Sequence, residues 1–226
     1  MIQVNRIYLI FNRLVTKKFL VDTSDYDKTN IGSPMPKFTF GWTNTFRYKN
    51  FDLSVFINGS YGNKVYNYLS MKLTHMNSPW TNQLNAVNGR AQLVPINPNK
   101  VYEDGTMWYN DVSNVMVANP GASIPRATIN DPNDNDRISD RYIEDGSYIR
   151  LKNISLGYTF PKKTIDKLGL SNLRIYANIQ NLLTITGYDG YDPEIGASTS
   201  SVNVYGLDNG RYPSPTVYSF GLNVSF

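Results

Sequence analysis

The chain has 226 residues, no cysteine and one histidine, which excludes disulfides, thiolate metal sites and cysteine nucleophiles. Its net charge of +4 comes from 22 basic and 18 acidic residues scattered along the sequence, so no nucleic acid is expected as a partner. No apolar run reaches the roughly 18 residues of a transmembrane helix, and only alternating β-strands remain as a way to cross a bilayer.

The N-terminal stretch, residues 1–22, differs from the rest. It lacks the uninterrupted apolar core and the small-residue cleavage site of a secretory signal. Either the chain stays inside the cell, or it is the remnant of a longer protein. We therefore separate residues 1–22, as an atypical stretch, from residues 23–226.

A first hairpin is predicted from residues 38–48 and 51–62. The former alternates large apolar residues with Thr, Gly and Arg, and only Asn44 interrupts its apolar face. The latter alternates in the same way, and Lys49 and Asn50 form a two-residue connection between them.

Residues 63–147 are predicted to form a long connection, which is larger than a structureless loop of a compact soluble domain. A short helix is expected at residues 66–75, followed by a segment that several prolines interrupt. Exposed aromatic residues in this connection are candidate contacts for sugar faces, although packing of the loop on itself is the favoured alternative. They are Trp80, Trp108 and Tyr109.

Candidate chemical groups in the same connection do not predict a site. His75 has no cysteine or paired carboxylates near it in the sequence, so an ordinary loop histidine is favoured over a zinc site or a triad. The segment DPNDNDRISD lacks the glycine and terminal glutamate of an EF-hand loop and is expected to be a solvated turn. Its acidic residues are Asp131, Asp134, Asp136 and Asp140.

The adjacent carboxylates Glu144 and Asp145 would point to opposite sides of a strand, so they cannot share acid and base roles across one bond. The sequence therefore predicts no enzyme activity, no metal site and no cofactor.

A second hairpin is predicted from residues 148–160 and 172–183, which alternate apolar with small or polar residues. Residues 161–171 close it, because Pro161 cannot extend the ladder and Gly169 permits a turn.

The last strand is predicted at residues 216–226, with Ser, Gly and Asn on one face and a final Phe226. From this strand alone, a membrane wall and a soluble sandwich are equally favoured. A sandwich should carry Lys, Glu and Thr outside, whereas the polar faces here are nearly uncharged. Connections that alternate between short and long also favour an outer-membrane barrel, in which all short turns share the end that holds Phe226.

Five segments together resemble the C-terminal barrel of SusC/RagA-type TonB-linked outer-membrane transporters. They are IGSPMPKF (31–38), YKNFDLSV (48–55), DGSYIRLKNISLGY (145–158), LRIY with the later QNL (173–182), and GYDPE (190–194). The resemblance covers about residues 23–226, which would make them the C-terminal portion of the receptor barrel.

The resemblance implies an all-β fold: an antiparallel transmembrane barrel of 22 strands with long extracellular loops. It also implies a location in the outer membrane, import of oligosaccharides or peptides, a SusD-like lipoprotein partner and energy coupling through the TonB complex. The chain departs from this pattern because it lacks a signal, a coupling box, a plug and most strands. It is thus expected to contribute wall and substrate-side loops in contact with outer-membrane lipid, and not to transport alone.

Two groups of residues take roles from the resemblance. The alternating residues of the last strand are similar to the signal that the barrel-assembly machinery reads: Tyr218, Phe220, Leu222, Val224 and Phe226. A second group orders its loop by a proline-fixed turn or touches a partner lipoprotein: Tyr191, Asp192, Pro193 and Glu194. The alternatives to a transporter fragment are a soluble or surface β-sheet binding module and a non-functional truncated gene product.

Overall fold

The computed structural model describes residues 7–8, 28–129, 131, 135–136, 138–195, 197–198 and 201–226. Most of the N-terminal stretch 1–22 lies outside the described residues, except for β1 (Ile7–Tyr8), which pairs antiparallel with β2 (Lys28–Thr29). The chain divides into two compact units. One comprises Met1–Ile31 and Asn67–Ile143, and the other comprises Gly32–Tyr66 and Glu144–Phe226.

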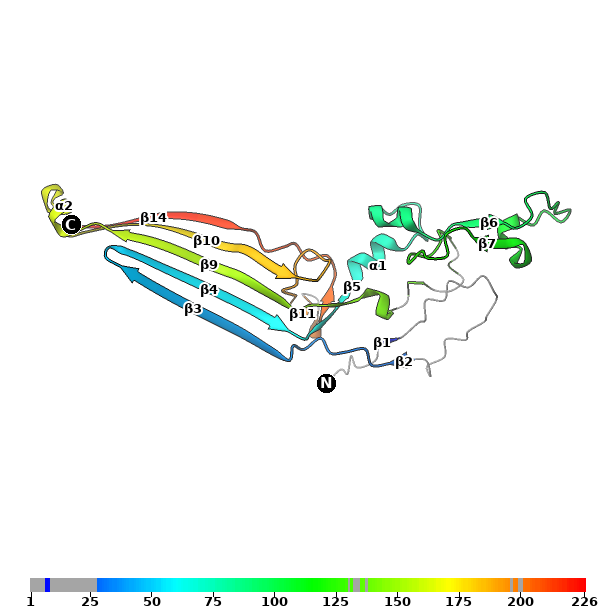
Figure 1. Ribbon diagram of the computed structural model, residues 1–226, viewed down its shortest axis with the longest axis horizontal. Helices are drawn as coiled ribbons and strands as arrows, with labels where there is room; N and C mark the ends of the chain where they lie inside the picture. Colours follow the sequence, from blue (N-terminus) through cyan, green and yellow to red (C-terminus); the bar gives the residue numbers. More distant parts are fainter. Residues whose placement is uncertain are drawn as a thin grey trace. The chain divides into compact units, whose positions relative to one another are not determined.

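A five-stranded antiparallel sheet dominates the second unit (Figure 1). Its strands follow one another in space in the order of the chain, so that every strand pairs with its predecessor. They are β3 (Phe38–Tyr48), β4 (Phe51–Tyr61), β9 (Tyr148–Thr159), β10 (Asn172–Thr186) and β14 (Val217–Ser225). All the predicted strands are confirmed, and only β10 runs clearly beyond its predicted end.

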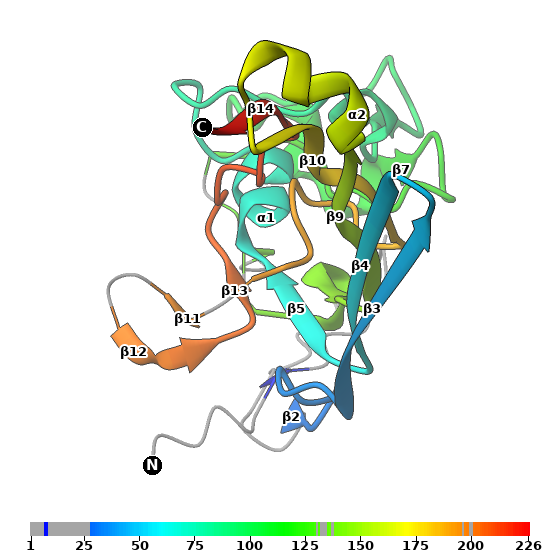
Figure 2. The ribbon, with the colours of Figure 1, turned by 90° about the vertical axis from the view of Figure 1, so that its left-hand side faces the viewer.

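The short connections share one end of this sheet, as predicted. Tyr48 pairs with Phe51 across the β3–β4 turn, Phe51 pairs with Tyr158, and Asn172 pairs with Ser225 next to the C-terminus. Figure 2 views the sheet from this end. The tight turn places Lys49 at a φ of 53°, in the left-handed region that favours glycine.

The connection between β9 and β10 is more ordered than a simple turn. It holds α2 (Lys162–Ile165) and the 3-10 helix η6 (Asp166–Leu168), neither of which was predicted. Ile165 is buried, and Gly169 ends the helical turns at a φ of 69°. The predicted turn at Gly169 is thereby confirmed, while Pro161 precedes a helix rather than an irregular loop.

The sheet exposes its apolar face. Residues that pair directly in an antiparallel sheet point to the same side, so the register places the alternating aromatic and aliphatic residues of the five strands together. Phe220 on β14 is 84% exposed and Trp42 on β3 is 57% exposed. On the polar face of these strands, the buried residues include Ser60 and Arg150. Nearly all positions on both faces of β3 and β14 are exposed, so the sheet differs from a soluble sandwich in leaving its large apolar side chains uncovered.

The polar face carries paired charges, which corrects the expectation that it is nearly uncharged. Arg174 on β10 reaches diagonally across β9 to Asp52 on β4, with Nη2 2.6 Å from Oδ2 and Nε 3.2 Å from Oδ1. Gly157 lies beneath this pair, and a Cβ there would collide with both side chains. The small residue is therefore what lets the two charges meet.

A bulge crosses the middle of the sheet. The register shifts between Phe56 and Ile57 of β4 against β9, and between Gln180 and Leu183 of β10 against β9. Asn181 has a φ of 52° at this point. Lys152 is unpaired at the register shift against β4, so the alternation of β9 changes there and Arg150 lies on the polar face. Arg150 and Lys152 contact the same carboxylate, that of Glu194.

Smaller sheets lie beyond the long-connection end of these strands. One has the order β13-β5-β8 and comprises β13 (Leu207–Asp208), β5 (Lys64–Asn67) and β8 (Ile143–Asp145). The other pairs β11 (Ala197–Ser198) with β12 (Ser201–Tyr205).

The first unit contains α1 (Tyr68–Thr74), close to the predicted helix, whose first turn is capped by the Asn67 side chain accepting from Ser70 N–H at 2.8 Å. Around it lie short elements that were not predicted. They are η2 (Asn85–Gly89), β6 (Leu93–Pro95), η3 (Trp108–Asn110), η4 (Val112–Asn114), β7 (Val115–Val117) and η5 (Asp140–Tyr142). Its buried residues include Met71, Ile124 and Tyr142. None of the helices in the described residues is long and apolar enough to cross a membrane.

Candidate functional site

An ion-pair network on the polar face of the sheet is the most highly connected polar site of the second unit. At its centre is Arg150, whose side chain is 3% exposed. Its Nη2 donates to Asp192, its Nη1 donates to Glu194 Oε2 at 2.7 Å, and its Nε donates to Thr184 Oγ1 at 2.8 Å. Lys152 Nζ lies 2.8 Å from the same Glu194 oxygen. The network joins the loop after β10 to β9.

Asp192 is the most constrained carboxylate of this network. Burial alone would raise its pKa, but hydrogen bonds from Ser214 N–H, Arg150 and Glu194 N–H outweigh burial and lower the pKa to about 2. The group is therefore ionised at neutral pH. Ser214 lies three residues before β14, so its hydrogen bond to Asp192 links the beginning and the end of the connection between β10 and β14.

Of the predicted group 191–194, Asp192 and Glu194 contact Arg150 and belong to this network. Asp192 and Pro193 are buried and Glu194 is half-buried, whereas Tyr191 is 63% exposed. The same loop contains a second buried contact, in which the Tyr188 hydroxyl donates to Asp208. Burial, followed by the contact with Asp208, raises the pKa of Tyr188, so its hydroxyl keeps its proton.

The residues expected to form the assembly signal lie together along β14. Tyr218, Phe220, Leu222 and Val224 pair with the apolar-face residues of β10 and share their side of the sheet. Phe226 follows the strand and is exposed.

The three aromatic residues expected in the long connection divide into two groups. Trp108 and Tyr109 contact each other edge to face, with ring centroids 5.7 Å apart, and Trp108 is half-buried. Trp80 is 91% exposed. Packing within the loop accounts for Trp108, but the side chain of Trp80 projects into solvent.

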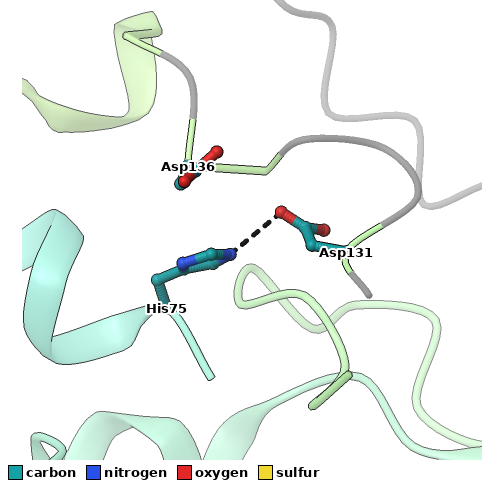
Figure 3. A group of neighbouring side chains, drawn as sticks. All are labelled: His75, Asp131 and Asp136. Atoms are coloured by element: carbon teal, nitrogen blue, oxygen red, sulfur yellow. Dashed lines mark hydrogen bonds and ion pairs between the residues drawn. The ribbon is translucent and has the colours of Figure 1, made fainter. Parts of the chain in front are cut away.

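His75 has a different environment from the one expected of it. Its Nε2 lies 2.9 Å from Asp131 Oδ2, and both side chains are nearly buried, at 11% and 10% exposure (Figure 3). Asp136 completes a group whose ligand atoms all lie within 4.8 Å of one another. The expectation of a solvated turn is wrong for Asp131, which folds back on a histidine 56 positions earlier. Asp134 lies outside the described residues, and Asp140 is exposed.

Glu144 and Asp145 lie on β8, as the sequence suggested, and have separate partners. Glu144 Oε2 accepts from Asp189 N–H at 2.9 Å, whereas Asp145 Oδ1 accepts from Ser147 N–H at 2.8 Å. They do not form a shared acid and base pair.

Two groups were missed by sequence reasoning. Arg150 and Lys152 had a visible signal, because they are cations within a strand whose other polar-face positions are mostly small. The joining of His75 to Asp131 and Asp136 had none, because no local pattern relates residues so far apart in the chain.

Comparison with known proteins identifies relatives of the whole sheet region. The chain is 35% identical over 210 residues to TonB-dependent receptor P3 of Formosa agariphila, a match that covers 91% of the chain and 18% of the relative. It is 28% identical over 203 residues to TonB-dependent receptor SusC of Bacteroides thetaiotaomicron, covering 88% of the chain and 16% of that receptor. No family model matches the sequence.

Solved structures share the fold. The RagAB peptide transporter matches with a TM-score of 0.64 and 21% identity, over 90% of this chain and 19% of the matched chain. The open-open state of the RagAB peptide importer matches 98% of this chain with a TM-score of 0.61. The antiparallel architecture predicted from the sequence is therefore confirmed as that of part of such a receptor.

These relatives are receptors and transporters rather than enzymes, in agreement with the prediction that the chain is not an enzyme. The chain spans 18% of the length of the first relative, so its similarity concerns a part of the receptor. By sequence and by fold, the chain is a homologue of SusC/RagA-type TonB-dependent receptors.

Proposed function

We propose that the chain contributes wall and substrate-side loops to the barrel of an outer-membrane TonB-dependent importer. The observation that carries this proposal is the continuous apolar face, on which aromatic and aliphatic side chains such as Phe220 and Trp42 stay exposed, while the charged Arg150 is buried on the other side. Lipid would cover the apolar face, and the polar face would line the lumen.

The alternative is a soluble or surface β-sheet module. It requires the apolar face to be covered by protein, because continuous exposed apolar surface of this extent is unfavourable in water. Within the described part of the second unit, residues such as Phe220 and Trp42 remain largely exposed. This favours a lipid-facing role.

The complete barrel is proposed to have 22 strands and to include residues 23–226 as its C-terminal portion. Among the residues that the structure describes, β3 and β14 each have a neighbouring strand on one side only in this sheet. Unpaired strand edges are unfavourable in hydrocarbon, so both need further strands before the sheet can reside in a bilayer. For this reason the chain is not competent for transport alone.

The proposed partners are those that the resemblance to SusC/RagA-type receptors implies. A SusD-like lipoprotein would cover the extracellular side, the TonB complex would supply energy, and the barrel-assembly machinery would read the last strand. The substrates are proposed to be oligosaccharides or peptides; RagAB is a peptide transporter by name.

Specific residues have proposed roles in this arrangement. Trp80 is the best-placed of the three aromatic residues for substrate contact, because it is the most exposed, whereas Trp108 and Tyr109 contact each other. Within 191–194, Asp192, Pro193 and Glu194 are proposed to order the loop through Arg150, and the exposed Tyr191 is left to contact a partner.

Single-cysteine scanning of β14 tests the membrane role, since the sequence contains no native cysteine. Cysteines at Tyr218, Phe220 and Leu222 are compared with cysteines at Val217, Ser219 and Asn223 after fluorescent labelling of the complete receptor barrel that contains this segment, with any cysteine outside the segment replaced, in lipid bicelles. A quencher attached to the acyl chains should quench the first set more strongly than the second. Equal quenching of both sets would contradict a lipid-facing strand.

A further inference from the structure

The His75 cluster has the composition of a metal-binding site, and it lies entirely within the first unit. Figure 3 shows the imidazole, the Asp131 carboxylate and the Asp136 carboxylate facing a common space. Imidazole nitrogen and carboxylate oxygen together suit divalent transition metals such as Zn²⁺, whereas Mg²⁺ and Ca²⁺ favour oxygen ligands alone.

The separations fit a shared metal ion. His75 Nε2 and Asp131 Oδ2 are 2.9 Å apart, about 0.5 Å less than the roughly 3.4 Å between neighbouring ligands that each lie about 2.1 Å from a tetrahedral metal ion. The third ligand atom, from Asp136, lies within 4.8 Å of both. All three can therefore reach one ion with small side-chain adjustments.

Asp131 is held in position for such a role by its neighbours. Its Oδ2 accepts from Asn135 N–H at 2.6 Å, and its Oδ1 accepts from Asn135 Nδ2 at 2.5 Å. Hydrogen bonds of this kind orient a ligating carboxylate and are typical of the groups that surround metal ligands. A small cavity lies against His75 and Asp131 and is also lined by Arg126 and Tyr142.

The charges of the cluster also favour a cation. Two carboxylates lie close together, and one of them is buried, an arrangement that is unfavourable unless positive charge compensates it. Arg126 lines the same cavity and supplies one positive charge. His75 adds no positive charge when it ligates a metal, because a ligating imidazole is neutral.

We propose that His75, Asp131 and Asp136 bind one divalent transition-metal ion, with water completing its coordination. The ion would join the segment that follows α1 to the loop containing Asp131, across 56 positions of sequence. Its role would be structural: it would stabilise the long connection between β4 and β9. The proposal does not depend on the membrane role of the sheet.

Zinc binding by the full chain tests the proposal. The chain is prepared without a polyhistidine tag in detergent micelles, treated with chelator, and titrated with ZnCl₂ in a calorimeter, with CaCl₂ titrated in parallel. We expect one Zn²⁺ per chain and much weaker binding of Ca²⁺. Absence of stoichiometric Zn²⁺ binding by the folded chain overturns the proposal and leaves His75 and Asp131 as a hydrogen-bonded pair.

Three variants identify the ligands. His75→Gln and Asp136→Asn should each weaken Zn²⁺ binding at least about tenfold. Asp136 is exposed, so its substitution removes a ligand without disturbing the buried contacts of Asp131. Asp140→Asn is the matched control, because Asp140 is an exposed aspartate outside the cluster, and it should leave binding unchanged. Equal affinity of His75→Gln, Asp136→Asn and the parent chain would place the bound zinc elsewhere.

A chemical probe gives an independent measurement. His75 is the only histidine, so its modification by diethyl pyrocarbonate reports on one imidazole. Zn²⁺ should slow the modification in the parent chain and in Asp140→Asn, and should have little effect in Asp136→Asn. Modification that zinc does not slow in the parent chain contradicts ligation by His75.

Discussion

At the scale of single residues, the buried Arg150 determines how the last long connection meets the sheet. A guanidinium with 3% exposure is stable only when its donors are satisfied, and here they reach one hydroxyl and two carboxylates. Arg150 on the polar face therefore holds the loop after β10 in place through Asp192 and Glu194. An isolated charge at this depth would instead need a counter-ion from elsewhere.

Asp192→Asn should destabilise the chain by about 3 kcal/mol, because Arg150 then remains buried beside a neutral amide. Urea unfolding in micelles measures the change. Asp189→Asn is the matched control, since Asp189 is exposed in the same loop, and it should change the stability by less than about 0.5 kcal/mol. Equal effects of the two substitutions would show that the network does not stabilise the loop.

The pH dependence of this contact has a definite sign. The pKa of Asp192 is about 2 in the folded chain, below the roughly 3.9 of an unfolded aspartate. Its contribution, about 2–3 kcal/mol, is therefore fully present above about pH 5 and is lost as the pH falls from about 5 through the folded pKa towards about 1. The Ser214 N–H donates a hydrogen bond to Asp192. As the pH falls over this range, hydrogen exchange of this amide in the parent chain should accelerate relative to that of a reference amide. In Asp192→Asn the same ratio should be independent of pH.

At the scale of elements, the strands are long and joined in chain order, and non-glycine residues with positive φ occur both in a connection, at Lys49, and in the bulge of β10, at Asn181. Lys49 adopts a left-handed φ of 53° in the β3–β4 turn, which costs an L-residue about 1 kcal/mol. Asn50 compensates by donating from Nδ2 to Thr159 O at 2.6 Å, which ties the turn to the end of β9.

Lys49→Gly should stabilise the chain by about 0.5–1 kcal/mol, because glycine adopts the left-handed conformation without steric cost. Asn50→Gly should have the opposite sign and cost about 1 kcal/mol, since it removes the hydrogen bond to Thr159. Urea unfolding of both variants in the same micelles compares them. A loss of stability in Lys49→Gly would contradict the assignment of strain to this turn.

At the scale of the whole chain, the distribution of apolar residues matters more than their number. The sequence is 41% hydrophobic, which is ordinary for a folded domain, yet the large sheet has its aromatic side chains on the outside. Water does not favour this arrangement, and under the proposed membrane role lipid would cover this face and further strands would pair with both edges.

Under the proposed lipid-facing role, Phe220→Arg should strongly reduce the insertion of the complete receptor barrel that contains this segment into phosphatidylcholine vesicles, because a guanidinium near the centre of a lipid-facing strand costs about 2–4 kcal/mol. Ser219→Arg is the matched control, since its neighbouring position lies on the polar face of the same strand. Vesicle flotation measures both bound fractions. If Ser219→Arg reduces binding as much as Phe220→Arg, the two faces are not distinguished by lipid.

Local pattern was sufficient to predict most of the sheet. Alternation of side chains along a strand depends only on neighbouring residues, so β3 has its predicted bounds and β14 differs from its prediction by one residue at each end. The helical turns of α2 and η6 were not predicted, because Pro161 and Gly169 signal a turn without specifying what lies between them.

The sequence by itself determined the five strands, the alternation of side chains on either side of the bulge and the resemblance to outer-membrane receptors, because these follow from periodicity and contiguous motifs. Only the tertiary structure decided which distant residues meet. The contacts of Arg150 with Asp192 and of His75 with Asp131 span 42 and 56 positions. Such contacts depend on how long connections fold back in space, and no local periodicity encodes that path.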